Sequence, residues 1–451
     1  MDENQNEGPD PFASRPESPS SIPSLLTDDD CPLPVAFQRW NICCFAAIFG
    51  LYYLAAPVSY IGITHANLLK ELGHQDTFAN LPSAIYQWTS VFAVFVAWFL
   101  PNPKLLKPLL VAAMVAMAGI SAAVAAILWL QLSAGVLSAG VVAHGAVFGA
   151  ANGVSLTTMW ELVRRGVSTS RRGHVLGLTF GFGPLLACVG SLGQQALFSK
   201  SAIGGFSFGY AFPTNYLVLF AAVVPILLVC SAFAGTFVVP SAAYEPHGGP
   251  HLKEIASGLR QFFTYRPLVF GAVAYLLVYS GGNAIIPNVS LRAKELLEEE
   301  MDTQGIQQFL RFGFKAATGV FLGWLLAKTS PKATLLATTS VLLLALAWVL
   351  NSRGWWCLMS FGLLGSGELF GAYFPNYVAT ASPKSRVRLN IAYLGLLSSL
   401  VGVASLGYGW IADEFGRFAS FYTAAGVLVL AIVLIMVALP ARPVPFSQGE
   451  E

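Results

Sequence analysis

GWLLAKTSPK, residues 323–332, marks a junction at which one long apolar run ends and a short basic turn leads into the next. AWFLPNPKLLK, residues 97–107, forms a similar junction in the first half of the chain. In both stretches a small residue and a Trp stand near the end of the apolar run, and Lys residues lie in the turn. These matching junctions indicate that the chain consists of two similar halves.

Apolar runs of this kind fill most of the chain beyond residue 39. A helix of about 20 apolar residues crosses the hydrocarbon core of a bilayer, which is roughly 30 Å thick. Charged residues make up only 11% of this chain, against about 25% in soluble domains. We therefore predict an all-α membrane protein with twelve transmembrane helices, at 40–64, 82–100, 107–131, 135–160, 174–197, 214–239, 267–288, 306–328, 333–351, 355–379, 388–411 and 418–440.

Changes in composition divide the chain into five parts. The beginning is rich in Pro, Ser and acids, which is typical of a disordered tail. A polar stretch near the middle includes a segment with amphipathic helical spacing, which is expected to lie on the membrane surface. The expected parts are a cytoplasmic N-terminal tail at 1–38, a six-helix bundle at 39–239, a linker at 240–266, a second six-helix bundle at 267–440, and a C-terminal tail at 441–451.

The distribution of Lys and Arg predicts the orientation in the membrane. Twelve spans place both termini on one side, and with the termini inside, 17 of the 25 basic residues fall in cytoplasmic segments. Loops rich in Lys and Arg stay on the cytoplasmic side. We therefore expect a multi-pass protein of the cell membrane with both termini cytoplasmic. The sequon Asn288-Val-Ser290 then lies on the outer side, where a secretory pathway could glycosylate it.

The junctions and the order of the spans resemble the major facilitator superfamily, over roughly residues 39–440. In that family a Gly-x-Leu-x-Asp-Arg-x-Gly-Arg-Lys type loop follows spans two and eight. The second junction keeps Gly323, Lys328 and Lys332, but Ala327 stands where the family has an acid. The first junction departs further, with Pro101 in place of the acid. A related pattern, GWIADEFG at 409–416, ends span eleven.

The resemblance implies two pseudo-symmetric six-helix bundles that alternate around a central site near the bilayer midplane. In the family, the acid of the loop helps to latch the two halves together on the cytoplasmic side. Because both junctions lack it, we expect a different latch, centred on Glu161 with Arg164, Arg165 and Arg171 nearby. The expected gating residues are Gly323, Lys328, Lys332, Glu161, Arg164 and Arg165.

Charged residues inside predicted spans are costly in a bilayer and are therefore candidates for function. Glu368 lies 13 residues beyond Trp355, about 20 Å along a helix and thus near the midplane. Its carboxyl could exchange a proton or bind a cationic group of a substrate, or it could serve only to join helices. Arg311 and Lys315 share one helix face. They could attract an anion or pair with Glu368, although Arg311 is expected to reach the outer headgroups instead.

Other polar residues complete the candidate site. His144 could titrate in transport, or it could be a packing partner alone. Asn152 falls on Glu368 when the two halves are aligned, which makes it a candidate ligand. Further candidates for the cavity lining are Tyr53, Gln87, Gln194, Tyr279 and Asn283.

The chemistry of soluble enzymes is not indicated by the sequence. It contains no GxxxxGK[ST], HExxH or GxSxG pattern and no CxxC pair. We expect no enzymatic activity, cofactor, metal or nucleic-acid partner, and a monomer in the lipid bilayer. The predicted function is secondary active transport of a small organic solute coupled to protons. Two alternatives are a uniporter of the same fold and a transport-inactive sensor that binds a partner.

Overall fold

The computed structural model describes residues 31–100, 102–199, 207–239, 252–297, 302–383 and 386–444. Within these ranges the structure is helical and has no strand. The first half contains α1 Val35–Leu54, α2 Ala56–Ser59, α3 Ile63–Glu71, α4 Asp76–Ser90, α5 Phe92–Phe99, α6 Leu106–Trp129, α7 Ala134–Gly166, α8 Thr169–Phe198 and α9 Thr214–Thr236. The second half contains α10 Leu252–Thr264, α11 Arg266–Gly282, α12 Ile286–Leu296, α13 Gln304–Lys328, α14 Pro331–Asn351, α15 Met359–Gly367, α16 Phe370–Ala381, α17 Val387–Ser398, α18 Val401–Phe415 and α19 Arg417–Ala438.

Ten helical stretches in the described part of the chain are long and apolar enough to cross a membrane. Two further passes come from α4 with α5 and from α8, whose apolar part is Phe182–Phe198. The passes follow one another in the predicted order, so the prediction of an all-α membrane protein is confirmed. The helix α10 covers the whole of residues 252–263, the segment in which the sequence predicts an amphipathic helix.

Several passes are broken or extended relative to the predicted spans. The first continues beyond a break at Gly62, where φ is +152°, into α3, and the seventh continues past Asn283 into α12. The first helix begins directly after Pro34, within the stretch expected to be a tail. Hydropathy does not reveal α3 and α12 because both helices contain many polar residues, some of which contact the opposite half of the protein, as Asn67 contacts Ser290 and Glu71 contacts Lys294. Irregular backbone within a membrane protein is tolerated where protein buries it.

Each half has its own hydrophobic core. The first core is built almost wholly from residues between 44 and 237, around Phe45, Phe148 and Phe220. The second is built almost wholly from residues between 262 and 439, around Phe361 and Phe421. Burial of large aromatic side chains within each half makes each half a separately packed body.

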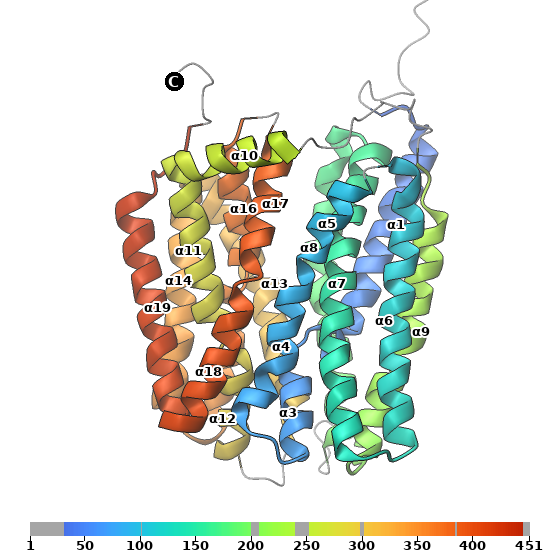
Figure 1. The fold of residues 1–451 in the computed structure, drawn as a ribbon, viewed down its shortest axis with the longest axis vertical. Coiled ribbons are helices and arrows are strands. Elements are labelled where there is room, and N and C mark those ends of the chain that lie inside the picture. The colour runs from blue at the N-terminus through green and yellow to red at the C-terminus, as the bar shows by residue number, and fades with distance from the viewer. Residues whose placement is uncertain are drawn as a thin grey trace, which may run out of the picture.

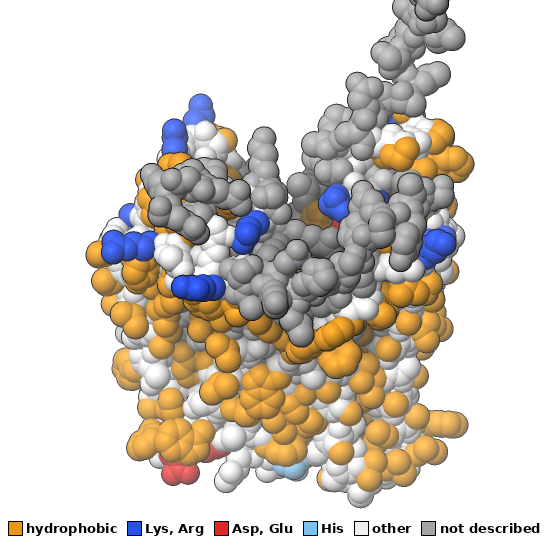
Figure 2. Space-filling view, turned by 45° about the horizontal axis from the view of Figure 1, so that its top comes forward, with side chains coloured by type: hydrophobic (Ala, Val, Ile, Leu, Met, Phe, Trp, Pro, Cys, Tyr) orange, Lys and Arg blue, Asp and Glu red, His pale blue; other side chains and the backbone are white. Residues whose placement is uncertain are grey.

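The two halves meet mainly along two helix pairs. Helix α8 packs along α13, and α4 packs along α18 (Figure 1). Helix α10 lies at one end of the molecule, here called the α10 end, whereas α3 and α12 lie at the opposite end, the α12 end (Figure 1). Figure 2 shows apolar side chains around the sides and Lys and Arg side chains on the rim of the α10 end. An apolar belt of this kind fits a lipid environment.

Candidate functional site

Glu368 stands in a break between α15 and α16, within the tenth pass. It is 7% exposed and accepts two charged hydrogen bonds from α13. Arg311 Nε donates to its Oε1 at 2.5 Å, and Lys315 Nζ donates to its Oε2 at 3.2 Å. The close approach of α15 to α13 depends on Gly365, because a Cβ there would lie 1.8 Å from the carbonyl oxygen of Arg311. Two cations and one carboxylate therefore form an ionic centre inside the protein.

The expectation that Arg311 reaches the outer headgroups is wrong. The side chain is 5% exposed and points inward because the Glu368 carboxylate lies within reach across α13 and α15. Its guanidinium also lies 5.7 Å from the ring centre of Tyr60, in the first half of the protein. Lys315 Nζ lies at the same distance from that ring. Cation–π contacts of this kind link the ionic centre to the opposite half.

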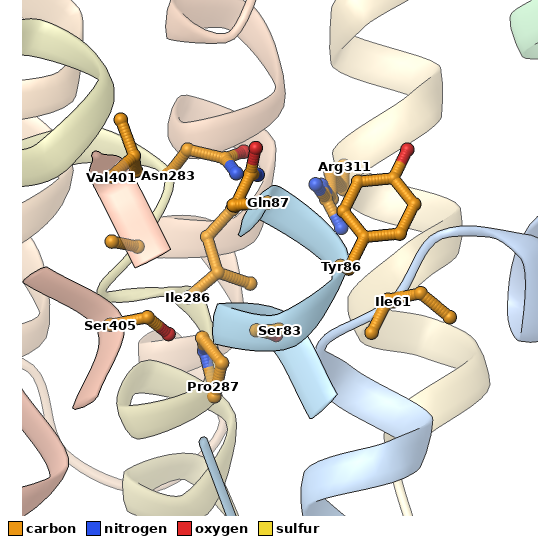
Figure 3. A pocket seen from close by; sticks show the side chains of 11 residues that line it. Ile61, Ser83, Tyr86, Gln87, Asn283, Ile286, Pro287, Arg311, Val401 and Ser405 are labelled. Atoms are coloured by element: carbon orange, nitrogen blue, oxygen red, sulfur yellow. The ribbon is translucent and has the colours of Figure 1, made fainter. Parts of the chain in front are cut away.

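A pocket lies between the two halves beside the ionic centre (Figure 3). It encloses about 340 Å³ of empty space, including some that is open to solvent. Three predicted site residues, Gln87, Asn283 and Arg311, line it. The complete lining is Ile61, Ser83, Tyr86, Gln87, Asn283, Ala284, Ile286, Pro287, Arg311, Val401 and Ser405.

Three polar residues of the pocket, Ser83, Tyr86 and Ser405, are not among the residues predicted from the sequence. Tyr86 directly precedes Gln87 within a predicted span, so the same signal of a polar group in an apolar run could have found it. Ser405 is 1% exposed, and its Oγ has no hydrogen-bond partner among the described residues. A lone Ser in an apolar helix carries no such signal, because its hydroxyl commonly bonds to the helix's own carbonyl groups.

Two further predicted residues stand directly behind the pocket. Tyr279, on α11, accepts a hydrogen bond of 2.9 Å from Gln87 Nε2, which joins the two halves. Asn152, on α7, donates to the hydroxyl of Tyr86 at 2.7 Å. Asn152 therefore positions a lining residue, and the structure does not bring it to the pocket surface itself.

Tyr53 and Gln194 contact the opposite half but do not line the pocket. Tyr53 stacks on Tyr60 at 5.7 Å between ring centres and meets Phe312 edge-on at 6.0 Å. Gln194 donates to Thr64 at 3.1 Å and accepts from Gln308 at 3.3 Å. Tyr53, on α1, and Gln194, on α8, therefore both contact α13 of the second half.

His144 is not the lone histidine that the sequence indicated. Its Nδ1 lies 3.0 Å from Nε2 of His65, on α3, and its Nε2 lies 3.2 Å from Ser121 Oγ. Ser121 donates its own proton to the Met117 carbonyl at 2.9 Å. A neutral pair therefore fits a chain in which His65 donates to His144 and His144 donates to Ser121. Both imidazoles are fully buried in the first half, and neither lines the pocket.

A network of ion pairs joins the two halves at the α12 end. Arg417, at the start of α19, donates to both carboxylate oxygens of Asp76, at 2.6 and 2.9 Å, and also pairs with Glu295. Lys70 Nζ lies 2.8 Å from the same Asp76 carboxylate. Lys294 pairs with Glu71 at 2.5 Å. We call these contacts the α12-end latch.

The GWIADEFG pattern takes part in this latch. The Asp413 carboxylate accepts hydrogen bonds of 2.8 Å from the backbone N–H groups of Asp76 and Thr77, at the start of α4. An anion is favoured there because the N-terminus of a helix carries partial positive charge. A Cβ on Gly409 would lie 2.6 Å from Thr77 Cα, so glycine permits the approach of α18 to α4.

The expected gating residues at the α10 end make their described ion pairs within one half. Glu161 accepts from Arg164 and Arg165 at 2.7 Å each, and all three lie on α7. Lys332 Nζ donates to the Met436 carbonyl at 2.7 Å, within the second half. The remaining two, Gly323 and Lys328, are exposed near the end of α13.

Burial near the α12 end makes Asn288 inaccessible and changes the pKa of Asp302. Asn288, the sequon residue, is fully buried and donates to the Tyr408 carbonyl at 2.9 Å, so the folded protein does not present it to a glycosylating enzyme. Asp302, in the loop before α13, has its pKa raised to about 6 by burial, while hydrogen bonds from Gln304 partly oppose the shift. Its backbone carbonyl accepts from Gln195 of the first half at 2.7 Å.

Comparison of the fold identifies its class. Solved structures with the same fold include a mutant of the nucleoside transporter NupG, with a TM-score of 0.66 and 10% identity over 89% of this chain and 100% of that chain. A D-xylose-proton symporter has a TM-score of 0.64 and 14% identity over 90% of this chain and 98% of its own. A mutant of the fucose:proton symporter FucP of E. coli has a TM-score of 0.59 and 13% identity over 88% of this chain and 98% of its own. No model of a protein family and no curated protein matches the sequence. The chain thus has the fold of major facilitator superfamily transporters.

Proposed function

We propose that this chain is a secondary active transporter of a small organic solute, and that Glu368 couples transport to protons. The observation that carries the proposal is the ionic centre of Glu368, Arg311 and Lys315 beside a pocket between two separately packed halves. Binding sites of transporters built from repeats lie at such a boundary. The similar structures named above include proton symporters for two sugars.

The ionic centre suggests how a proton and a solute share one site. While Glu368 is ionised, it holds both Arg311 and Lys315. Protonation of Glu368 removes one charge and releases the two cations, which can then bind a solute or turn toward another partner. Because the released cations cannot remain buried without compensation, solute binding and protonation favour each other.

We further propose that the protein lies in the cell membrane with both termini cytoplasmic. The Lys and Arg side chains at the rim of the α10 end support this orientation (Figure 2). The α12 end is then the outer side, and the α12-end latch closes the outer entrance in the state described here. Opening to the outside requires the pairs between Asp76 and Arg417 and between Glu71 and Lys294 to separate.

Transport by purified protein in liposomes tests this function. A thermal-shift screen against amino acids, sugars, organic acids and drugs first selects a solute, because binding stabilises the native state. Uptake of that solute is then measured with and without an inward proton gradient. We expect Glu368→Gln to lose accumulation driven by the gradient and to keep solute exchange across the membrane.

The matched control is Glu414→Gln, which removes an exposed carboxyl at the end of α18. This control should accumulate solute as the wild type does. Uptake that ignores the proton gradient in the wild type identifies a uniporter. Proton uptake that accompanies solute in the wild type and persists unchanged in Glu368→Gln contradicts the role of Glu368.

A further inference from the structure

The charges around the pocket do not balance. Arg311 and Lys315 contribute two positive charges, and Glu368 contributes one negative charge, so the ionic centre carries +1. The residues that line the pocket include no acid. An uncompensated charge inside a membrane protein is costly, so a site of this kind gains from a ligand of the opposite sign.

Only one nitrogen of the Arg311 guanidinium has a hydrogen-bond partner among the described residues. Its Nε donates to Glu368, whereas no hydrogen bond to a described residue engages its two terminal nitrogens. Arg311 lines the pocket, and Figure 3 shows its guanidinium beside Tyr86 and Gln87 at the pocket wall. A planar guanidinium with two free terminal nitrogens matches a carboxylate, which accepts two parallel hydrogen bonds.

Ser405 supplies a second, independent contact for a ligand. Its Oγ is buried, lines the pocket and has no hydrogen-bond partner among the described residues. A buried hydroxyl without a partner loses the free energy of its hydrogen bonds with water. A polar group of a bound solute, such as a hydroxyl, would restore that interaction. Ser405 lies on α18 and Arg311 on α13, so the two contacts approach the pocket from different helices.

We propose that this pocket binds a small organic monoanion, namely a carboxylate that carries a further polar group such as a hydroxyl. The Arg311 terminal nitrogens bind the carboxylate, and Ser405 bonds to the polar group. The inference rests on the proposed transport function and names its substrate class. A monoanion brings the charge of the ionic centre from +1 to zero, and protonation of Glu368 then brings the loaded site back to +1.

Pairs of compounds in which the carboxylate is replaced by a neutral carboxamide of nearly the same shape test the inference. Lactate with lactamide, glycolate with glycolamide, and benzoate with benzamide are titrated against the purified full chain while its thermal midpoint is followed. We expect a hydroxy acid to stabilise the protein at a concentration at least about tenfold below that of its amide, since hydrogen bonds between two charged groups are stronger than those to a neutral amide. Benzoate, which has no hydroxyl, should bind more weakly than lactate.

Two variants assign the binding to the guanidinium. Arg311→Lys keeps the positive charge but loses the planar guanidinium that donates two parallel hydrogen bonds. The affinity for a carboxylate should therefore fall by about tenfold or more. Arg311→Gln combined with Glu368→Gln leaves Lys315 and the same net charge of +1, and avoids a buried carboxylate without its partner. This double variant should fold, as its melting curve will show, and should lose the preference for acid over amide.

The outcomes separate two claims, namely that the pocket binds a carboxylate and that the protein transports a solute. An amide that stabilises as well as its acid, or the failure of every acid to stabilise, overturns the inference. Uptake of the amide into liposomes would then leave the transport function intact. A carboxylate that binds and loses its preference in the double variant supports the inference. If that carboxylate is never taken up into liposomes, the inference stands and the proposed transport function fails.

Discussion

Replacing Arg417 with Gln should open the α12 end of the protein. Arg417 belongs to the second half, and it donates to both carboxylate oxygens of Asp76 in the first half, at 2.6 and 2.9 Å. The Asp76 side chain is 5% exposed and that of Arg417 is 13% exposed, so water screens this pair only in part. Gln can keep one neutral hydrogen bond and loses the charge as well as the contact to Glu295.

The size of the effect follows from the environment of the pair. Removing one partner from a buried ion pair costs about 3–5 kcal/mol. Asp76 keeps its contact with Lys70 at 2.8 Å, which reduces the loss. We therefore expect the state that is closed at the α12 end to lose about 2–3 kcal/mol, somewhat below the buried-pair range. That loss shifts the balance between closed and open states by about 30-fold to 150-fold, at 1.4 kcal/mol per factor of ten.

Spin labels at Leu132 and Trp356 report this change as a distance distribution between the halves. Both residues are exposed, at 46% and 69%, in segments that directly follow α6 and α14 at the α12 end. Cys43, the exposed native cysteine, is replaced by Ser before labelling. The wild type should give a single short distance, and Arg417→Gln should add a longer component. An unchanged distribution, or an equal shift in the control Arg353→Gln, would refute the reasoning.

Three further predictions concern stability, and each is read from thermal or denaturant unfolding of the purified protein. Gly365→Ala should destabilise strongly, because its Cβ would meet the backbone of α13 at 1.8 Å, whereas Gly323→Ala, with open space around it, should be neutral or slightly stabilising. Equal changes in stability in Gly365→Ala and Gly323→Ala would contradict the close packing of Gly365 on α13. Asp302→Asn should become more stable relative to wild type as pH rises from about 4 to about 6, since the raised pKa makes the folded wild type hold a proton that its unfolded chain releases. A stability difference between the two proteins that does not change over this pH range would contradict the burial of the Asp302 carboxyl. His144→Leu should cost about 2–4 kcal/mol, because it leaves the Nε2 of His65 without its buried acceptor, and proton-driven uptake that survives this change would assign the histidine pair to packing.

The candidate site was partly predictable because charge inside an apolar run is visible without a fold. Glu368, Arg311 and Lys315 stood out in this way, and they prove to be neighbours. The direction in which Arg311 points was mispredicted. Near a helix end, a long basic side chain reaches the headgroups unless a buried carboxylate lies closer, and only packing of α15 on α13 brings that carboxylate near.

The latch shows a different reason for failure. The sequence pointed to the α10 end, where the basic junctions lie, whereas the described ion pairs between the halves gather at the α12 end. Their residues, such as Asp76 and Arg417, stand at helix termini next to short loops, where charged residues are ordinary and carry no signal of a role. Asp413 was noticed only through its GWIADEFG pattern.

The sequence by itself determined that this protein is an all-α membrane protein of two similar halves, because hydropathy and span length are properties of short stretches of chain. It also determined which spans carry a charge. Only the tertiary structure decided which polar groups meet, since partners such as Arg311 and Glu368, His65 and His144, or Asp76 and Arg417 are 57, 79 and 341 residues apart. Their meeting depends on how each helix is rotated and on how closely glycines let the helices approach, and both are set by packing that no single stretch contains.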